Sequence, residues 1–147
     1  MPQLTITRDV GDFRSQWDVL YAAYAAYYKV EQTPEMRDRT WSWIMEGRII
    51  CLMALDNAGR PVGFAHIREF LRPLMSSLAG FLDDLFVDPA QRGGGVVDAL
   101  FNAAKDLGRE NNWSVIRWIT RDDNYRARSV YDRIATRTNW VTYDLIP

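Results

Sequence analysis

The chain has 147 residues, 48% of them hydrophobic and 25% charged, which is typical of one compact soluble domain, here residues 1–147. Its 18 basic and 19 acidic residues leave a net charge of -1, which argues against binding nucleic acid or an anionic membrane through net charge. The chain has a single cysteine, Cys51, which excludes an intrachain disulfide, argues against a zinc or other metal site and favours a cytoplasmic location. The longest apolar run, residues 49–55, is too short to span a membrane.

Hydrophobic periodicity and turn residues divide the chain into strands and helices. The expected elements are a strand around 4–6, helices over 11–29 and 33–44, strands over 49–55, 61–71 and 79–87, a helix over 94–108, a strand over 113–120, a helix over 125–135 and a closing strand over 139–145. Three consecutive strands followed by alternation predict an α/β (α+β) fold. Its mixed sheet is antiparallel at first, parallel around the third helix, and covered by about four helices on both faces.

A glycine-rich turn, Pro89 to Gly95, joins the predicted strand 79–87 to the next helix. Glycines let backbone N–H groups converge on a phosphate, and the first turn of a helix adds further free donors. Valines follow the glycines where a P-loop needs lysine and a hydroxyl, and Asp98 stands where a dinucleotide fingerprint needs a third glycine. The turn therefore predicts an anion site of another kind, or else only a flexible connection.

The same segment resembles the acetyl-CoA-binding motif of the GNAT N-acetyltransferases, in which arginine or glutamine, two residues, glycine, one residue and glycine or alanine follow a strand. Here the motif reads Arg92-Gly93-Gly94-Gly95-Val96-Val97, so Val97 replaces the last small residue. Residues Asn124 to Tyr131 are similar to the asparagine, alanine and tyrosine signature of the family's following helix. The resemblance implies a GNAT fold that binds acetyl-CoA between its fourth and fifth strands.

The resemblance also implies direct transfer of the acetyl group from acetyl-CoA to an amine, and a set of residues that bind the cofactor. A bulge around 85–87 would free strand amides for the pantetheine arm and the acetyl oxygen. The implied cofactor-binding residues are Leu85, Phe86, Val87, Gln91, Arg92, Gly93, Gly94, Gly95, Val96, Val97, Asn124, Ala127 and Tyr131. The resemblance also makes Tyr131 the general acid that protonates the CoA sulfur. Without the resemblance, the position of Tyr131 on an amphipathic helix would fit a core tyrosine equally well, and Asn124 would fit the N-cap of that helix.

Removing a proton from the acceptor ammonium calls for a carboxylate, and Asp83 and Asp84 precede the motif. Along a strand they point to opposite faces, so at most one reaches the cleft directly. Residues 82–87 are similar to a stretch of diamine, polyamine and thialysine acetyltransferases, which favours Asp83 as the base or amine contact. A structural ion pair with arginine is the alternative for either acid.

The resemblance implies as acceptor a small-molecule amine, such as a polyamine, a diamine or an amino-acid-like compound, or a basic protein or peptide. Residues 118–124 resemble a histone and polyamine subgroup, and the family implies a homodimer. Two other functions stay open: a CoA-binding module without turnover, and an arginine-rich nucleic-acid binder, against which the acidic pI argues. We expect His66 in a packed or hydrogen-bonded core position and some aromatic residues of the early helices at a cleft.

Overall fold

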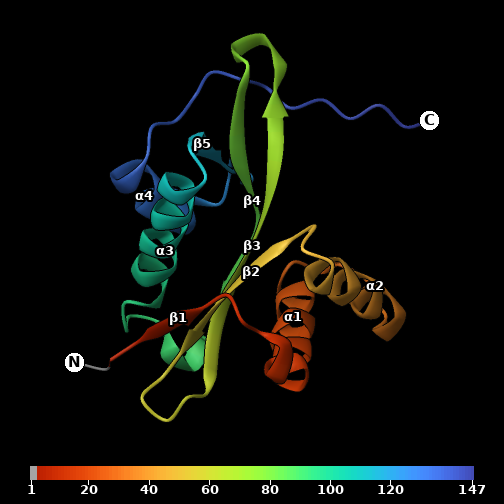
Figure 1. The fold of residues 1–147 in the computed structure, drawn as a ribbon, viewed down its shortest axis with the longest axis vertical. Coiled ribbons are helices and arrows are strands. Elements are labelled where there is room, and N and C mark those ends of the chain that lie inside the picture. The colour runs from red at the N-terminus through yellow and green to blue at the C-terminus, as the bar shows by residue number, and fades with distance from the viewer. Residues whose placement is uncertain (1–2) are drawn as a thin grey trace.

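A computed structural model describes residues 3–147 of the chain, and five strands in it form one sheet (Figure 1). The strands are β1 (Thr5–Thr7), β2 (Ile50–Leu55), β3 (Pro61–Arg72), β4 (Ser77–Val87) and β5 (Trp113–Arg117), and they lie in the order β1-β2-β3-β4-β5. The first four pair antiparallel, and β5 pairs parallel to β4. The predicted mixed, mostly antiparallel sheet is therefore confirmed.

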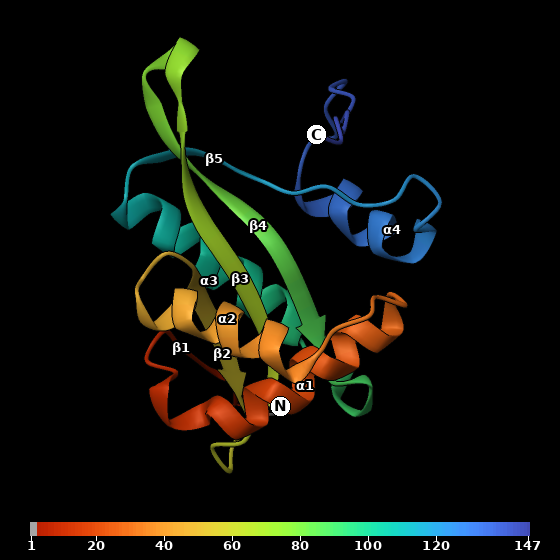
Figure 2. The same ribbon diagram turned by 90° about the vertical axis from the view of Figure 1, so that its right-hand side faces the viewer.

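Helices cover both faces of this sheet, as predicted (Figures 1 and 2). On one face lie α1 (Arg14–Tyr27) and α2 (Pro34–Met45), and on the other lies α3 (Val96–Glu110), with α4 (Tyr125–Ile134) beside it. Short 3-10 helices occupy Gly11–Phe13, Pro73–Met75 and Pro89–Gln91. The Thr33 hydroxyl caps α2 by accepting a hydrogen bond from the Met36 amide at 3.2 Å. No helix within residues 3–147 is long and apolar enough to cross a membrane.

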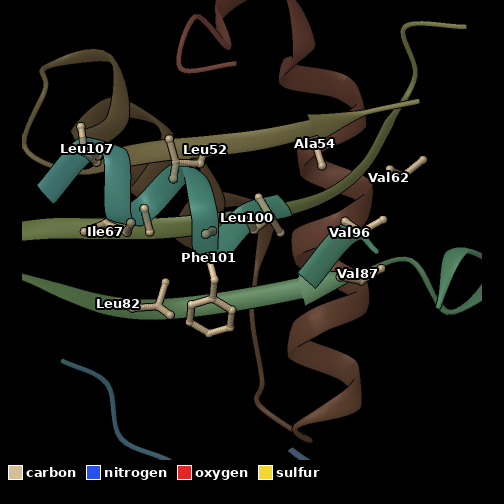
Figure 3. Close-up of a cluster of buried hydrophobic side chains, with 12 residues drawn as sticks. Leu52, Ala54, Val62, Ile67, Leu82, Val87, Val96, Leu100, Phe101 and Leu107 are labelled. Carbon is tan, nitrogen blue, oxygen red and sulfur yellow. The ribbon is translucent and has the colours of Figure 1, made fainter. Parts of the chain in front are cut away.

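Two apolar clusters hold the helices to the sheet. Figure 3 shows the cluster between the sheet and α3, where Leu100 and Phe101 of the helix pack on Leu52, Ile67 and Leu82 of the strands. The second cluster lies under α1 and α2 and consists of Val10, Trp17, Leu20, Ile44, Cys51, Met53, Phe64 and Phe86. Each face of the sheet thus buries its own set of alternating strand residues, as strands covered on both faces require.

The alternation along β4 reverses at one residue. In the pairing with β3, His66 lies opposite Asp84 while Ile67 lies opposite Leu82, so Asp83 is an extra residue in β4. Leu82 belongs to the α3 cluster, whereas Phe86 belongs to the α1 cluster, although an even spacing would put both on one face. The bulge was expected around 85–87 and is in fact at Asp83, because pairing with β3, rather than the local sequence, sets it.

Strand β5 accompanies β4 for only part of its length. Their pairs are Leu78 with Trp113, Gly80 with Ile116 and Phe81 with Arg117. Gly80 permits this approach, since a Cβ atom there would lie 2.5 Å from the Trp113 ring. Beyond Phe81, within residues 3–147, the second edge of β4 has no strand beside it, and its backbone groups are available to a ligand.

The closing strand expected over 139–145 is absent from the described structure. Residues 136–147 form neither helix nor strand, and they run away from the domain in Figure 1. Trp140 is 84% exposed and Tyr143 is 89% exposed. The composition of this segment favours β structure, but a strand needs a neighbour for its hydrogen bonds, and residues 3–147 supply none here.

Candidate active site

A cavity of about 450 Å³ lies where the glycine turn, the end of β4 and the helices α1, α3 and α4 meet. Its walls include every residue predicted to bind the cofactor except Gly94. They are Leu85, Phe86, Val87, Gln91, Arg92, Gly93, Gly95, Val96, Val97, Asn124, Ala127 and Tyr131. The two sequence motifs, about thirty residues apart in the chain, therefore face one another across a single space.

The glycine turn gives this cavity a set of backbone donors. Gly93 and Gly95 both have φ of +82°, a left-handed conformation that glycine adopts without steric cost. Gly95 stands at the N-cap of α3, where no side chain accepts a hydrogen bond from the first amides of the helix. These free N–H groups and the positive end of the α3 dipole fit the diphosphate of a CoA thioester.

Three arginine side chains line the same cavity, one from the glycine turn and two from α4. Arg92 lies in the turn, with its guanidinium 5.7 Å from the centroid of the Tyr27 ring. Arg126 and Arg133 lie on α4 and line the cavity as well. They supply positive charge for phosphate groups beyond what the backbone amides provide.

Several residues on the cavity wall were not among those predicted to bind the cofactor. These are Tyr27, Tyr28, Asp98, Arg126, Val130 and Arg133. The α4 members are four and three residues apart from one another, which is helical spacing, so the helix periodicity carried a usable signal for them. Tyr27 and Tyr28 were expected only as part of an aromatic surface on the early helices, some of which was predicted to line a cleft, and that prediction is confirmed for both.

Tyr131 is a half-buried phenol on the cavity wall. Its ring packs against Trp118 and Phe101, with ring centroids 5.3 Å and 6.1 Å away. Burial raises the pKa of Tyr131 above its usual value, and the charge of Tyr28 raises it further. The hydroxyl therefore keeps its proton over the neutral range.

Asn124 lines the cavity from the start of α4, and small Ala127 lies between it and Tyr131 along the helix. Asn124 occupies the N-cap position, but its side chain makes no capping hydrogen bond. Instead its amide donates to the Thr120 hydroxyl at 3.1 Å. The N-cap position considered for this residue is therefore confirmed, but its side chain is held toward the loop that precedes α4 instead of capping the helix.

Asp84 lies on the α1 side of the sheet inside a polar and aromatic cluster. Its Oδ2 atom is 2.8 Å from His66 Nδ1 and accepts a hydrogen bond of 2.9 Å from the Tyr21 hydroxyl. Burial, the largest influence, would by itself raise the pKa of Asp84, but the hydrogen bonds from His66, Tyr21 and Tyr24 act the other way and the pKa is lowered. The carboxylate is thus held as an anion, and His66 occupies the hydrogen-bonded core position predicted for it.

Asp83 does not point away from Asp84, so the predicted alternation of the two aspartates is wrong. The bulge interrupts the alternation, and the partner of Asp83, Arg68, lies on the same face of β3 as His66. The Oδ2 atom of Asp83 accepts a hydrogen bond of 2.8 Å from Arg68 Nε, at the surface of the sheet. The Arg68 guanidinium in turn lies 4.7 Å from the centroid of the Phe81 ring. Asp83 is therefore part of an exposed ion pair, although its charge still contributes to the raised pKa of Tyr21.

Neither aspartate lines the cavity, but a row of tyrosines on α1 leads from Asp84 to it. Tyr21, Tyr24 and Tyr28 follow at successive turns of the helix, with ring centroids 5.9 Å and 4.9 Å apart. Tyr28 is on the cavity wall. The carboxylate and the cavity are thus linked through phenol side chains.

This fold and site define a class of protein: a transferase that takes an acyl group from a CoA thioester. Residues 17–135 match the model of the acetyltransferase (GNAT) family, and the chain belongs to that family. It is an acetyl-CoA-dependent N-acetyltransferase, and its cofactor is acetyl-CoA.

Known proteins resemble the chain over most of its length. It is 25% identical over 134 residues to the D-amino-acid N-acetyltransferase HPA3 of Saccharomyces cerevisiae, covering 86% of this chain and 81% of the relative. A crystal structure of a probable acetyltransferase has a TM-score of 0.87 at 23% identity, covering 99% of this chain and 97% of that one. A ribosomal-protein-alanine N-acetyltransferase from Brucella melitensis biovar Abortus 2308 has a TM-score of 0.82 at 23% identity, covering 99% of both chains. These structures share the fold.

Proposed function

We propose that this acetyltransferase transfers the acetyl group directly to a primary amine of a small molecule, with Tyr131 as the acid and Asp84 as the proton acceptor. One observation carries the proposal: a single cavity is lined by the glycine turn, by Tyr131 and by Tyr28. Tyr28 is the cavity end of the tyrosine row that leads to Asp84. Bound acetyl-CoA supplies an activated acetyl thioester, and the chain supplies binding, orientation and proton transfer.

The proposed cofactor contacts follow the cavity wall. The end of β4, Leu85 to Val87, has an edge without a strand beside it, on which backbone groups can bind the pantetheine arm. The glycine turn and the first turn of α3 offer amides to the diphosphate. Arg126 and Arg133 on α4 face the remaining phosphate charge.

Tyr131 suits the role of acid because its phenol is half-buried, on the cavity wall and protonated. The leaving thiolate needs a proton, and a phenol held at this position can donate it and recover it from solvent. Replacing Tyr131 with phenylalanine keeps the packing on Trp118 and Phe101. We expect kcat to fall by about 10²-fold while the KM for acetyl-CoA changes little.

Asp84 is supported over Asp83 as the proton acceptor. The acceptor amine has a pKa of about 10 as an alkylammonium ion and must lose a proton before it attacks. Asp84 is an anion behind the tyrosine row, whereas Asp83 is paired with Arg68 at the surface. An anion below the cavity also attracts a cationic amine toward it.

The acceptor class is proposed as a small amine of the polyamine, diamine or amino-acid-like kind. The similarity to a D-amino-acid N-acetyltransferase supports a small acceptor. A panel of polyamines, diamines, aminoglycosides, D- and L-amino acids and basic peptides, assayed by thiol release from acetyl-CoA, tests this. Turnover restricted to basic peptides would contradict the small-molecule proposal, and Tyr131→Phe with unchanged turnover would contradict the acid.

We also propose a cytoplasmic homodimer. Cys51 is buried and free, and burial and then the charge of Asp84 raise its pKa to about 12, which fits a reducing compartment. The C-terminal segment exposes Trp140, Val141, Tyr143, Leu145 and Ile146, an apolar surface that a second copy could cover.

Sedimentation velocity tests the dimer. We expect the wild-type chain to sediment as a dimer and the double variant Trp140→Asp, Tyr143→Asp as a monomer. Val19→Asp, which changes an exposed apolar residue on α1, is the control and should remain dimeric. A monomeric wild-type chain at micromolar concentration would contradict the proposal.

A further inference from the structure

Asp84 is the last member of a buried line of three side chains. Trp17 of α1 donates from Nε1 to His66 Nε2 of β3 at 3.0 Å, and the other ring nitrogen, Nδ1, lies 2.8 Å from Asp84 Oδ2 of β4. Trp17 is 0% exposed and His66 is 1% exposed. Three separate elements therefore place one hydrogen-bonded line behind a single carboxylate.

The chemistry of the indole fixes the state of the histidine. A tryptophan N–H can only donate, so His66 Nε2 must accept and carries no proton. The one proton of the neutral ring is then on Nδ1, where it is donated to Asp84. A proton on Nε2 would face the indole N–H donor, so the geometry assigns the ring proton to Nδ1.

The hydrogen bonds to the Asp84 carboxylate all come from uncharged donors or from His66, while the nearby Arg68 guanidinium is paired with Asp83. His66 and Tyr21 both bind the same carboxylate oxygen, Oδ2, and Oδ1 takes no part in either bond. The ionisable groups near Asp84 come from several elements. They are Tyr21 and Tyr24 on α1, Tyr28 at its C-cap, Cys51 on β2, His66 on β3 and the ion pair of Asp83 with Arg68. Each of the phenols and the thiol is kept protonated by burial, which raises its pKa.

We propose that Trp17 and His66 are positioning residues for acetyl transfer, which hold Asp84 by Oδ2 as an anion and leave Oδ1 to receive the proton. The proposal rests on the role of Asp84 put forward above. The proton that leaves the acceptor ammonium ends on Asp84 Oδ1 and is later released to solvent. His66 neither gains nor loses a proton during the cycle.

A matched pair of substitutions at His66 separates positioning from packing. The amide of asparagine can place an N–H where Nδ1 lies, whereas that of glutamine reaches toward the position of Nε2 and leaves Asp84 without its donor. We expect His66→Asn to keep kcat/KM within about fivefold of wild type and His66→Gln to lower it by about 10²-fold.

The dependence of kcat/KM on pH tests whether His66 lowers the pKa of Asp84. His66 lowers the pKa of Asp84, so losing its N–H raises that pKa and leaves Asp84 protonated up to a higher pH. The acid limb of kcat/KM should therefore move to higher pH in His66→Gln and stay in place in His66→Asn. Identical acid limbs in the wild type and both variants, at equal thermal stability, would overturn the proposal.

A spectroscopic test keeps the proposal falsifiable if His66→Gln does not fold. His66 is the only histidine among the 147 residues, so the 15N spectrum of histidine-labelled protein reports this ring alone. In the wild-type protein we expect a neutral ring with its proton on Nδ1 throughout the active pH range. Trp17→Phe removes the donor to Nε2 and should change the 15N shift of that nitrogen.

Two results would overturn the proposal and leave the proposed function intact: a wild-type ring protonated on Nε2, or an unchanged ring in Trp17→Phe. A different measurement tests whether Asp84 is the proton acceptor at all. If Asp84→Asn keeps wild-type turnover, Asp84 is not the proton acceptor, whatever the state of His66.

Discussion

The two sides of β4 are built in opposite ways. On the α1 side, Asp84 is held by His66 and Tyr21, and α1 buries Trp17 fully against the sheet. On the other side, Tyr131 lies on α4, a ten-residue helix with no fully buried residue. The proposed proton acceptor is therefore fixed by buried hydrogen bonds, whereas the acid is held through partly buried ring contacts with Phe101 and Trp118, on a helix without a fully buried residue. We infer that bound acetyl-CoA completes the second side.

The largest effect is expected from removing the charge of the α1 side. Asp84→Asn keeps the shape of the side chain but cannot accept the proton, and kcat/KM should fall by about 10²- to 10⁴-fold. Asp83→Asn is the matched control, because it changes the neighbouring residue and breaks only an exposed ion pair with Arg68. Steady-state kinetics at saturating acetyl-CoA measure both. An equal loss of kcat/KM in the two variants would mean that Asp84 has no special role, and the proposed difference between the two sides of β4 would not hold.

Cofactor binding should change the two sides unequally. At a CoA concentration of about 100 times Kd, binding stabilises the competent state by about 2.7 kcal/mol, which corresponds to roughly 100-fold slower exchange of amides that open locally. Hydrogen exchange followed by mass spectrometry should show this slowing in α4 and the glycine turn, with far less in α1 and β3. Equal protection in α1 would contradict the comparison.

The sequence predicted those features that local patterns determine. The glycine turn could be predicted as an anion site because residues 93–95 lie between a predicted strand and a predicted helix. Their amides can converge on an anion only in that position. Asn124 and Tyr131 were recognisable because seven residues make about two helical turns. Both motifs were placed in advance on elements that the structure contains, and both line the cavity.

Features that depend on pairing between distant segments could not be predicted in this way. The choice between Asp83 and Asp84 depends on a bulge set by the register with β3, opposite His66. The line from Trp17 to Asp84 joins residues up to 67 positions apart, with no local signal for it. The expected strand over 139–145 had the right composition but lacked a neighbouring strand, which composition cannot reveal.

A smaller effect is expected at the glycine turn. Gly95 has φ of +82°, and alanine in that conformation costs about 1 kcal/mol, which corresponds to roughly fivefold in binding. Gly95→Ala should raise the KM for acetyl-CoA by that factor and leave kcat nearly unchanged. Gly11→Ala is the control, since Gly11 has open space and no left-handed conformation. A fall in kcat without a change in KM would place the turn outside cofactor binding.

The smallest effect is expected at Val97, the residue that departs from the family motif. Val97 lies in the first turn of α3 and on the cavity wall, so its methyl groups narrow the space beside the glycine turn. The proposed diphosphate contacts are backbone amides, and Val97→Ala leaves those amides in place while adding a better helix former, by about 0.6 kcal/mol. Because these donors do not depend on the side chain, the KM for acetyl-CoA should fall by no more than about threefold, and kcat should not change. Titration calorimetry with CoA measures the same difference without turnover. A change larger than that produced by Gly95→Ala would mean that side-chain bulk, rather than the backbone, governs binding on the less packed side of β4.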